Sequence, residues 1–225
     1  MSWITGITKN GKDLMPEALA KGAEVDPDMA PYLKYCYGIP CGYLNYYYRP
    51  RKRLAELKAD AEKQTRGEVC TDIEKELLEI YSDKSLYVKP EQLNDRGGAL
   101  YSEAAVSLLN AIENNLNEIH AINVQNQGAL PWMADDDVVE VQAIVNRQSI
   151  TPIPIRGFEN EHIKALMRTV KAYEKHAAKA ALTGDRDEAI RALMIHPLIG
   201  DIDAAVPCFN ELLEAHKEYL PQFWR

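Results

Sequence analysis

A pair of glycines that leads straight into a helix is the feature that most constrains how this chain can fold. The pair lies in the run Arg96-Gly97-Gly98-Ala99-Leu100-Tyr101-Ser102, which precedes an apolar helical pattern over residues 104–112. Glycine lacks the Cβ that restricts the backbone, so the chain can change direction sharply at this point. Tyr101 then stands at the start of the new helix. We expect its side chain to face a cleft rather than a core.

Composition bounds the class of protein. Of the 225 residues, 46% are hydrophobic, which is enough for a packed core in one large or two small domains. The formal net charge of −8 argues against nucleic acid and anionic membranes as partners, because both would repel the chain. The basic cluster Arg49-Pro50-Arg51-Lys52-Arg53 is either the solvated start of a helix or a local contact with an anion or partner.

The cysteines indicate a reducing compartment. Four of them, at positions 36, 41, 70 and 208, are too few and too scattered for a disulfide scaffold. No charged segment leads into an apolar stretch, and no apolar run is long enough to span a membrane, so we expect a cytoplasmic protein. Cys36 and Cys41 have no second Cys or His pair nearby, and we interpret them as buried thiols rather than metal ligands.

Periodicity predicts an α+β protein that is predominantly helical, with a small mixed or antiparallel sheet. No repeat or linker marks a boundary, so we expect a single domain over residues 1–225, with a helical arm over 1–95 and a helix–sheet–helix body over 96–225. We expect helices over 16–23, 26–37, 54–81 with a break near Gly67, 103–114, 159–183, 185–195 and 201–219, and strands over 118–124, 138–145 and 151–155.

Several separate blocks of sequence, in a fixed order, resemble the second half of glycoside hydrolase family 4, and within it the 6-phospho-β-glucosidases. The fold that this resemblance implies is that of the C-terminal domain of family 4 glycosidases and of lactate/malate dehydrogenase-like enzymes. Besides the glycine run, the blocks are Ser2-Trp3-Ile4-Thr5-Gly6, Tyr43-Leu44-Asn45-Tyr46-Tyr47-Tyr48, Asn123-Val124-Gln125-Asn126-Gln127-Gly128-Ala129-Leu130-Pro131, Asn146-Arg147-Gln148, Thr183-Gly184-Asp185-Arg186-Asp187 and Glu214-Ala215-His216-Lys217-Glu218-Tyr219.

The resemblance also implies cofactors. Family members use NAD and a divalent metal such as manganese, which are held by an N-terminal half with a glycine-rich turn, a Cys and a His. We expect this chain to begin just after the position of that His, and therefore to bind neither cofactor and to be inactive by itself. The partners that follow are a phosphorylated β-glucoside in the complete enzyme, a possible separate N-terminal half, and further copies in a homo-oligomer.

Tyr101 is the candidate catalytic residue, because the resemblance places the family's base at this tyrosine. In the family, oxidation of the sugar C3 hydroxyl by NAD makes the hydrogen on C2 acidic, the tyrosine removes it, and the group on C1 is eliminated. A phenol has an ordinary pKa near 10 and needs a nearby cation to act as a base, and Arg96 is the candidate for that cation. The alternative is a half-buried tyrosine whose ring simply packs.

Further candidates could contact the substrate, and Arg96 is also one of them. Asn123, Asn126 and Gly128 follow a predicted strand, where amides bind sugar hydroxyls and a glycine admits a ligand close to the backbone. The alternative is a turn in which Asn side chains satisfy their own backbone. Arg147 could bind an anionic group of the substrate through two hydrogen bonds, or could form a surface ion pair.

Tyr43, Tyr46, Tyr47 and Tyr48 form an aromatic cluster that either stacks on a sugar or fills a subunit interface, and we favour the interface. Two other functions stay open. The chain could be a stand-alone binding or assembly module that kept the fold and lost the chemistry. It could also belong to an α-glycosidase or galacturonidase of the same family.

Overall fold

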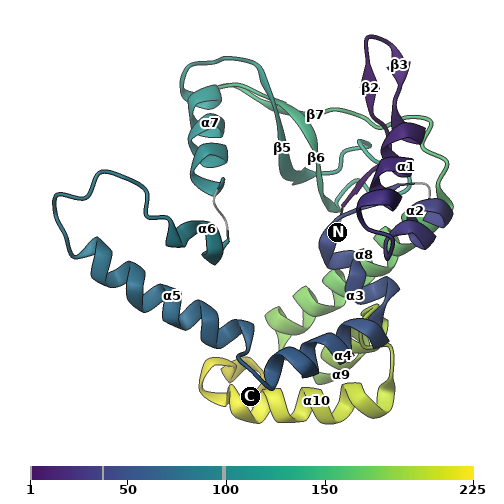
Figure 1. Cartoon of the computed structure of the whole chain (residues 1–225). Coiled ribbons are helices and arrows are strands. Elements are labelled where there is room, and N and C mark those ends of the chain that lie inside the picture. The colour runs from purple at the N-terminus through teal and green to yellow at the C-terminus, as the bar shows by residue number, and fades with distance from the viewer. Residues whose placement is uncertain (1, 37, 98–99) are drawn as a thin grey trace. The chain divides into compact units, whose positions relative to one another are not determined.

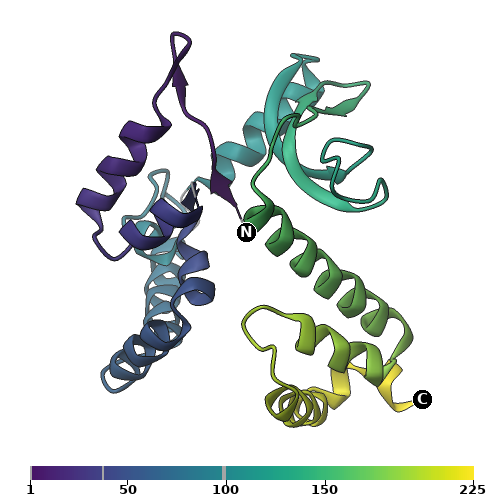
Figure 2. The same ribbon diagram turned by 90° about the vertical axis from the view of Figure 1, so that its right-hand side faces the viewer.

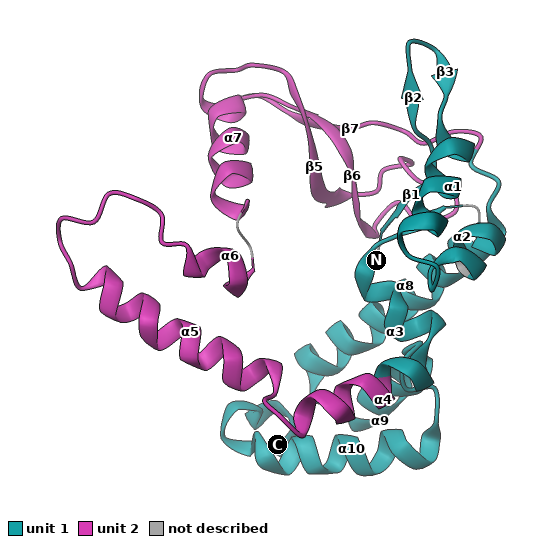
Figure 3. Cartoon of the chain, viewed as in Figure 1, with its two compact units in different colours: residues 1–53, 158–225 teal, residues 54–157 magenta. Residues whose placement is uncertain are grey.

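A computed structural model describes residues 2–36, 38–97 and 100–225 (Figure 1). The chain divides into two compact units (Figure 3). Unit 1 comprises Met1–Arg53 and Phe158–Arg225, and unit 2 comprises Leu54–Gly157. The predicted division at residue 95 does not coincide with the borders of these units. Gly98 and Ala99 of the glycine run lie outside the described residues.

The first part of unit 1 is a small helical layer with two short strand pairs. Met15 of α1 (Met15–Val25), Leu33 of α2 (Ala30–Cys36) and Leu44 are almost fully buried and form its core. Gly22 lets the two helices approach, since a Cβ there would lie 3.1 Å from a methyl group of Leu33. The elements are β1 (Trp3–Ile4), β2 (Thr8–Lys9), β3 (Lys12–Asp13), α1 (Met15–Val25), α2 (Ala30–Cys36), β4 (Ile39–Pro40), η1 (Gly42–Leu44) and α3 (Asn45–Tyr48); β1 pairs with β4 and β2 with β3, both antiparallel.

The second part of unit 1 is a helical bundle in which α8 and α9 run side by side (Figure 2). Its helices begin at side chains that accept hydrogen bonds from the backbone, Asn160 for α8, Asp185 for α9 and Asp201 for α10. The elements are α8 (Glu161–Thr183), α9 (Arg186–Ile195), α10 (Ile202–Ala215), η2 (Lys217–Tyr219) and η3 (Pro221–Trp224).

A buried carboxylate joins α8 to α9. Glu188 of α9 lies 2.7 Å from the Lys179 ammonium and 2.5 Å from Nδ1 of His176, both on α8, and 3.1 Å from the Arg191 guanidinium. The hydrogen bond from Lys179, followed by the one from His176, lowers the pKa of Glu188 to about 2. The carboxylate is therefore ionised at neutral pH, and the Lys179 and Arg191 cations beside it offset the cost of burying its charge.

Unit 2 begins with most of α4 (Pro50–Ala61), followed by α5 (Arg66–Tyr81), α6 (Gln92–Arg96) and α7 (Tyr101–Glu113). The predicted helix over 54–81 is thus two helices. The break precedes Gly67, because Thr65 and Glu68 form a capping box that starts α5 at Arg66. A guanidinium nitrogen of Arg66 donates to the carbonyl oxygen of Asp95 at 2.6 Å, which links α5 to α6.

A three-stranded antiparallel sheet completes unit 2. It consists of β5 (Glu118–Gln125), β6 (Val138–Val145) and β7 (Ile150–Pro152) in the order β5-β6-β7. Along β6, buried and exposed residues alternate, so Val139, Val141, Ala143 and Val145 share one face. The predicted fold class, mostly helical with a small antiparallel sheet, is confirmed. Among the described helices, none is long and apolar enough to cross a membrane.

Candidate functional site

Tyr101 is the first residue of α7, and its side chain is 80% exposed. Gly97, which ends α6, has a φ of +90°, a conformation that glycine adopts without strain. This exposure is higher than the alternative of a half-buried tyrosine with a packed ring would give. The geometry agrees with the expected side chain that faces a cleft, while its part in catalysis stays a prediction.

A pocket of about 650 Å³ opens beside Tyr101, entirely within unit 2. The end of α5, the loop over residues 86–90 and the start of α7 surround it. Most of its side chains are aromatic or aliphatic. The described residues that line it are Tyr81, Leu86, Tyr87, Val88, Lys89, Pro90, Leu93, Gly97, Tyr101 and Ser102. Sequence reasoning missed the loop over residues 86–90. A signal was present, since aromatic and aliphatic side chains are unusual in a turn between helices.

Arg96 is exposed at the end of α6, and its carbonyl oxygen accepts a hydrogen bond from Arg66 at 3.4 Å. It is not among the residues that line the pocket of Tyr101. The structure therefore gives no support to Arg96 as the cation that keeps the phenol ionised, and this role stays a prediction.

Asn126 and Gly128 lie in the loop between β5 and β6, as expected. Asn123 instead lies within β5, opposite Glu140 of β6. Asn126 has no exposed surface. Its amide nitrogen lies 3.0–3.1 Å from the carbonyl oxygens of Leu130, Met133 and Ala134, and its side-chain oxygen accepts from the Leu130 N–H at 2.7 Å. The Asn126 side chain thus forms hydrogen bonds with backbone groups of its own loop, which is the alternative to a contact with the sugar.

Gly128 and Arg147 also lie away from the pocket of Tyr101. Gly128 has a φ of +78°, and its carbonyl oxygen accepts a hydrogen bond from Arg156 at 3.1 Å. Arg147 donates to the carbonyl oxygen of Glu113 and lies 3.9 Å from that residue's carboxylate, which matches the surface ion pair. This geometry does not support a contact of Gly128 or Arg147 with the substrate, and both contacts stay predictions.

In the tyrosine cluster of unit 1, one ring is exposed and the other three are half-buried. Tyr43 is exposed, whereas the hydroxyl of Tyr48 lies 2.9 Å from Nε2 of His162, and the two rings stack. Burial, with an added contribution from Cys36, raises the pKa of Tyr48 well above its usual value. Tyr48 is therefore a neutral structural hydroxyl, and Tyr46 stacks under the guanidinium of Arg53 at 5.1 Å.

Internal ion pairs account for part of the basic cluster. Arg49 lies 3.2 Å from the carboxylate of Asp28, and Lys52 pairs with the same carboxylate. These two cations, Lys52 first, hold the pKa of Asp28 below its usual value. The arrangement agrees with a solvated helix start that is tied to the turn before α2.

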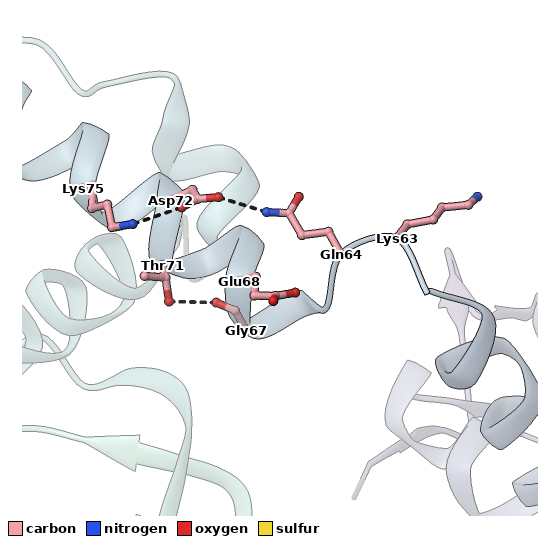
Figure 4. A pocket seen from close by; sticks show the side chains of 7 residues that line it. All are labelled: Lys63, Gln64, Gly67, Glu68, Thr71, Asp72 and Lys75. Atoms are coloured by element: carbon pink, nitrogen blue, oxygen red, sulfur yellow. Dashed lines mark hydrogen bonds and ion pairs between the residues drawn. The ribbon is translucent and has the colours of Figure 1, made fainter. Parts of the chain in front are cut away.

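A second pocket of unit 2 lies at the start of α5 and is polar (Figure 4). Several of the groups that line it form hydrogen bonds with one another. Asp72 accepts from Gln64 at 2.9 Å and from Lys75 at 3.3 Å, and the Thr71 hydroxyl donates to the carbonyl oxygen of Gly67 at 3.0 Å (Figure 4). Lys63 points away from these residues in the same view. The pocket offers balanced charges and no reactive group.

Possible metal ligands do not gather at one place among the described residues. Within residues 2–36, 38–97 and 100–225, no group of three or more His, Cys, Asp or Glu side chains could hold a metal ion. Cys36 is buried and Cys41 is half-buried. Partial burial acts to raise the pKa of the Cys41 thiol, but hydrogen bonds from Ser2 and from the N–H groups of Tyr43 and Leu44 outweigh it and lower that pKa.

Comparison with known families decides the identity of the fold. Residues 1–199 match the family described as "Family 4 glycosyl hydrolase C-terminal domain". This chain belongs to that family.

Curated relatives agree with this family. The chain is 41% identical to a probable 6-phospho-beta-glucosidase of Bacillus subtilis over 95% of this chain and 48% of the relative. It is 34% identical to a 6-phospho-beta-glucosidase of Escherichia coli over 82% of this chain and 41% of the relative. The chain thus spans about half the length, or less, of these family 4 relatives.

The fold is similar to a solved family 4 structure, the 6-phospho-beta glucosidase of Thermotoga maritima with NAD and glucose-6-phosphate. The TM-score is 0.85 at 28% identity, over 97% of this chain and 52% of the other. A further structure of that enzyme contains manganese as well as NAD⁺ and glucose-6-phosphate, with the same TM-score.

Proposed function

We propose that this chain is the substrate-binding and oligomerising part of an NAD- and divalent-metal-dependent glycosidase that hydrolyses 6-phospho-β-glucosides. The observation that carries the proposal is the position of Tyr101. Tyr101 is exposed at the start of α7 and lines a pocket. The domain that carries it is a family 4 C-terminal domain, and its curated relatives include 6-phospho-beta-glucosidases.

The described residues offer no metal site, and the sequence contains no glycine-rich dinucleotide turn between a strand and a helix. The chain spans about half the length of relatives for which structures with NAD and manganese are known, so the proposal assigns both cofactors to a further part of the enzyme. When bound there, they supply the oxidation at the sugar C3 hydroxyl that makes the C2 hydrogen acidic.

In its ionised form, Tyr101 accepts the C2 proton at its phenolate oxygen and becomes a neutral phenol. An exposed side chain at the mouth of a pocket can reach a sugar carbon, which a packed ring cannot. The C1–O bond of the glycoside then breaks as the electron pair from C2 forms a C1–C2 double bond, and the aglycone leaves as an alkoxide that takes up a proton. Water adds to C1 while C2 regains a proton, and return of the hydride to C3 restores the alcohol and completes the hydrolysis. This route needs no pair of carboxylates, since deprotonation and elimination replace acid-assisted substitution at C1.

Replacing Tyr101 with Phe tests this role. The chain is joined to an N-terminal half from the same family and supplied with a 6-phospho-β-glucoside, NAD⁺ and manganese. We expect Tyr101→Phe to abolish exchange of the C2 hydrogen with solvent deuterium, which NMR or mass spectrometry measures. Stability should change little, because the ring is kept and at most one hydrogen bond of about 0.5–1.5 kcal/mol is lost.

Tyr219→Phe is the matched control, since Tyr219 is also exposed but lies in unit 1, outside the pocket. It should exchange C2 hydrogen at the parent rate. Normal exchange in Tyr101→Phe would remove Tyr101 as the base. A parent enzyme that neither exchanges nor hydrolyses either anomer of the substrate would favour the binding-module alternative.

A further inference from the structure

We propose that the pocket beside Tyr101 is a subsite for the aglycone, and that it selects flat, apolar aglycones. The inference rests on the proposed function, because it takes Tyr101 as the group that meets C2 of the sugar. It goes further by assigning a binding role to the loop over residues 86–90 and to the ends of α5 and α6.

Bond connectivity fixes what must lie near Tyr101. The aglycone oxygen is attached to C1, and C1 is bonded to C2. The aglycone therefore begins two bonds from the carbon that loses its proton. If the phenolic oxygen of Tyr101 reaches the C2 hydrogen, the parts of the substrate that come nearest to Tyr101 are the sugar ring around C2 and the beginning of the aglycone. The 6-phosphate is attached across the ring from C2 and extends away from this point.

The chemistry of the lining distinguishes between these occupants. A sugar ring presents hydroxyls and needs several hydrogen-bonding side chains, and a phosphate needs cations or backbone N–H groups. Here the described lining consists mainly of tyrosine rings and aliphatic groups, among them Leu86, Val88 and Leu93. Lys89 is the single cationic side chain in the described lining. The surface thus suits the apolar part of the substrate rather than its hydroxyls or its phosphate.

Exposure supports a ligand rather than a folding role for these side chains. Tyr87 is 94% exposed, and Tyr81 and Val88 are also largely in contact with water. Adjacent exposed aromatic and aliphatic groups commonly mark a binding surface, because water contact is unfavourable for them. A volume of about 650 Å³ lies in the range of small-molecule pockets, so one or two fused rings can be accommodated.

The test compares two probes that differ only in the aglycone, benzyl β-D-glucoside 6-phosphate and methyl β-D-glucoside 6-phosphate. Methyl NMR signals of Leu86, Val88 and Leu93 are followed while each probe is titrated into the 225-residue chain. We expect saturable shifts with the benzyl compound, at an affinity about twofold to tenfold higher than for the methyl compound, as for one aromatic contact. Both probes carry the same sugar and phosphate, so the difference reports the aglycone.

Two variants and one control make the test specific. Tyr87→Ser removes an aromatic surface and Val88→Asp places a charge in the pocket, and both residues are exposed enough for folding to persist. Each should abolish the preference for the benzyl probe. Tyr219→Ser, an exposed tyrosine of unit 1, should keep it. In the joined enzyme, the same two variants should lower kcat/KM for the benzyl compound relative to the methyl compound.

The outcomes separate this inference from the proposed function. Equal affinity for both probes, or a preference that survives both variants, overturns the aglycone subsite even if Tyr101→Phe abolishes C2 exchange. Shifts that depend on protein concentration without any probe mean that a second copy covers the pocket, which also overturns it. A benzyl preference that both variants abolish supports the subsite, whatever the exchange experiment shows about Tyr101 as the base.

Discussion

The side chain of Asn126 holds together the loop that joins β5 to β6. Because it is fully buried and bonded to four backbone groups of the loop, its removal leaves buried polar groups without partners. We expect Asn126→Ala to lower the free energy of unfolding by about 2–4 kcal/mol in urea titrations. Asn123→Ala, on the exposed side of β5, should stay within about 0.5 kcal/mol. A stable Asn126→Ala with weakened substrate binding would instead restore the predicted sugar contact.

Gly184 decides how helix α8 ends. It has a φ of +74°, and a Cβ there would overlap the carbonyl group of Gln222 in the C-terminal segment. We expect Gly184→Ala to destabilise the chain by about 2–4 kcal/mol, because it adds backbone strain and a steric clash. Gly200→Ala is the control, since Gly200 also has a positive φ but open space around its Cα. Its cost should be about 1 kcal/mol. Equal losses in thermal or urea unfolding would show that the contact with Gln222 is unimportant.

At the scale of the whole molecule, the chain spans about half the length of the family 4 relatives that it matches, and apolar side chains remain exposed in unit 2. Val106 and Leu109 of α7 are 64% and 60% exposed on one helix face. We expect the 225-residue chain to self-associate, so that light scattering gives a mass that rises above 25.4 kDa with concentration. Val106→Lys with Leu109→Lys should shift association to higher concentration. A constant monomer mass would contradict the prediction.

Part of the site could be predicted from the sequence. The glycine run placed Tyr101 at the start of a helix, and the structure has α7 begin at that residue. Local patterns do not show which other segments approach it. The loop over residues 86–90 meets Tyr101 only because α5, α6 and α7 fold around it, so Arg96 was predicted as its neighbour and Tyr87 was not.

The sequence by itself determined the elements whose signals are local. Alternation along residues 138–145 predicted β6 with its bounds, and the helix predicted over 185–195 agrees with α9 except at its first residue, because side-chain period involves only near neighbours. Only the tertiary structure decided that the Asn126 side chain is buried and that a pocket lies beside Tyr101. Burial and pocket walls depend on segments distant in the sequence, and their approach is set by packing of the whole unit rather than by any local preference.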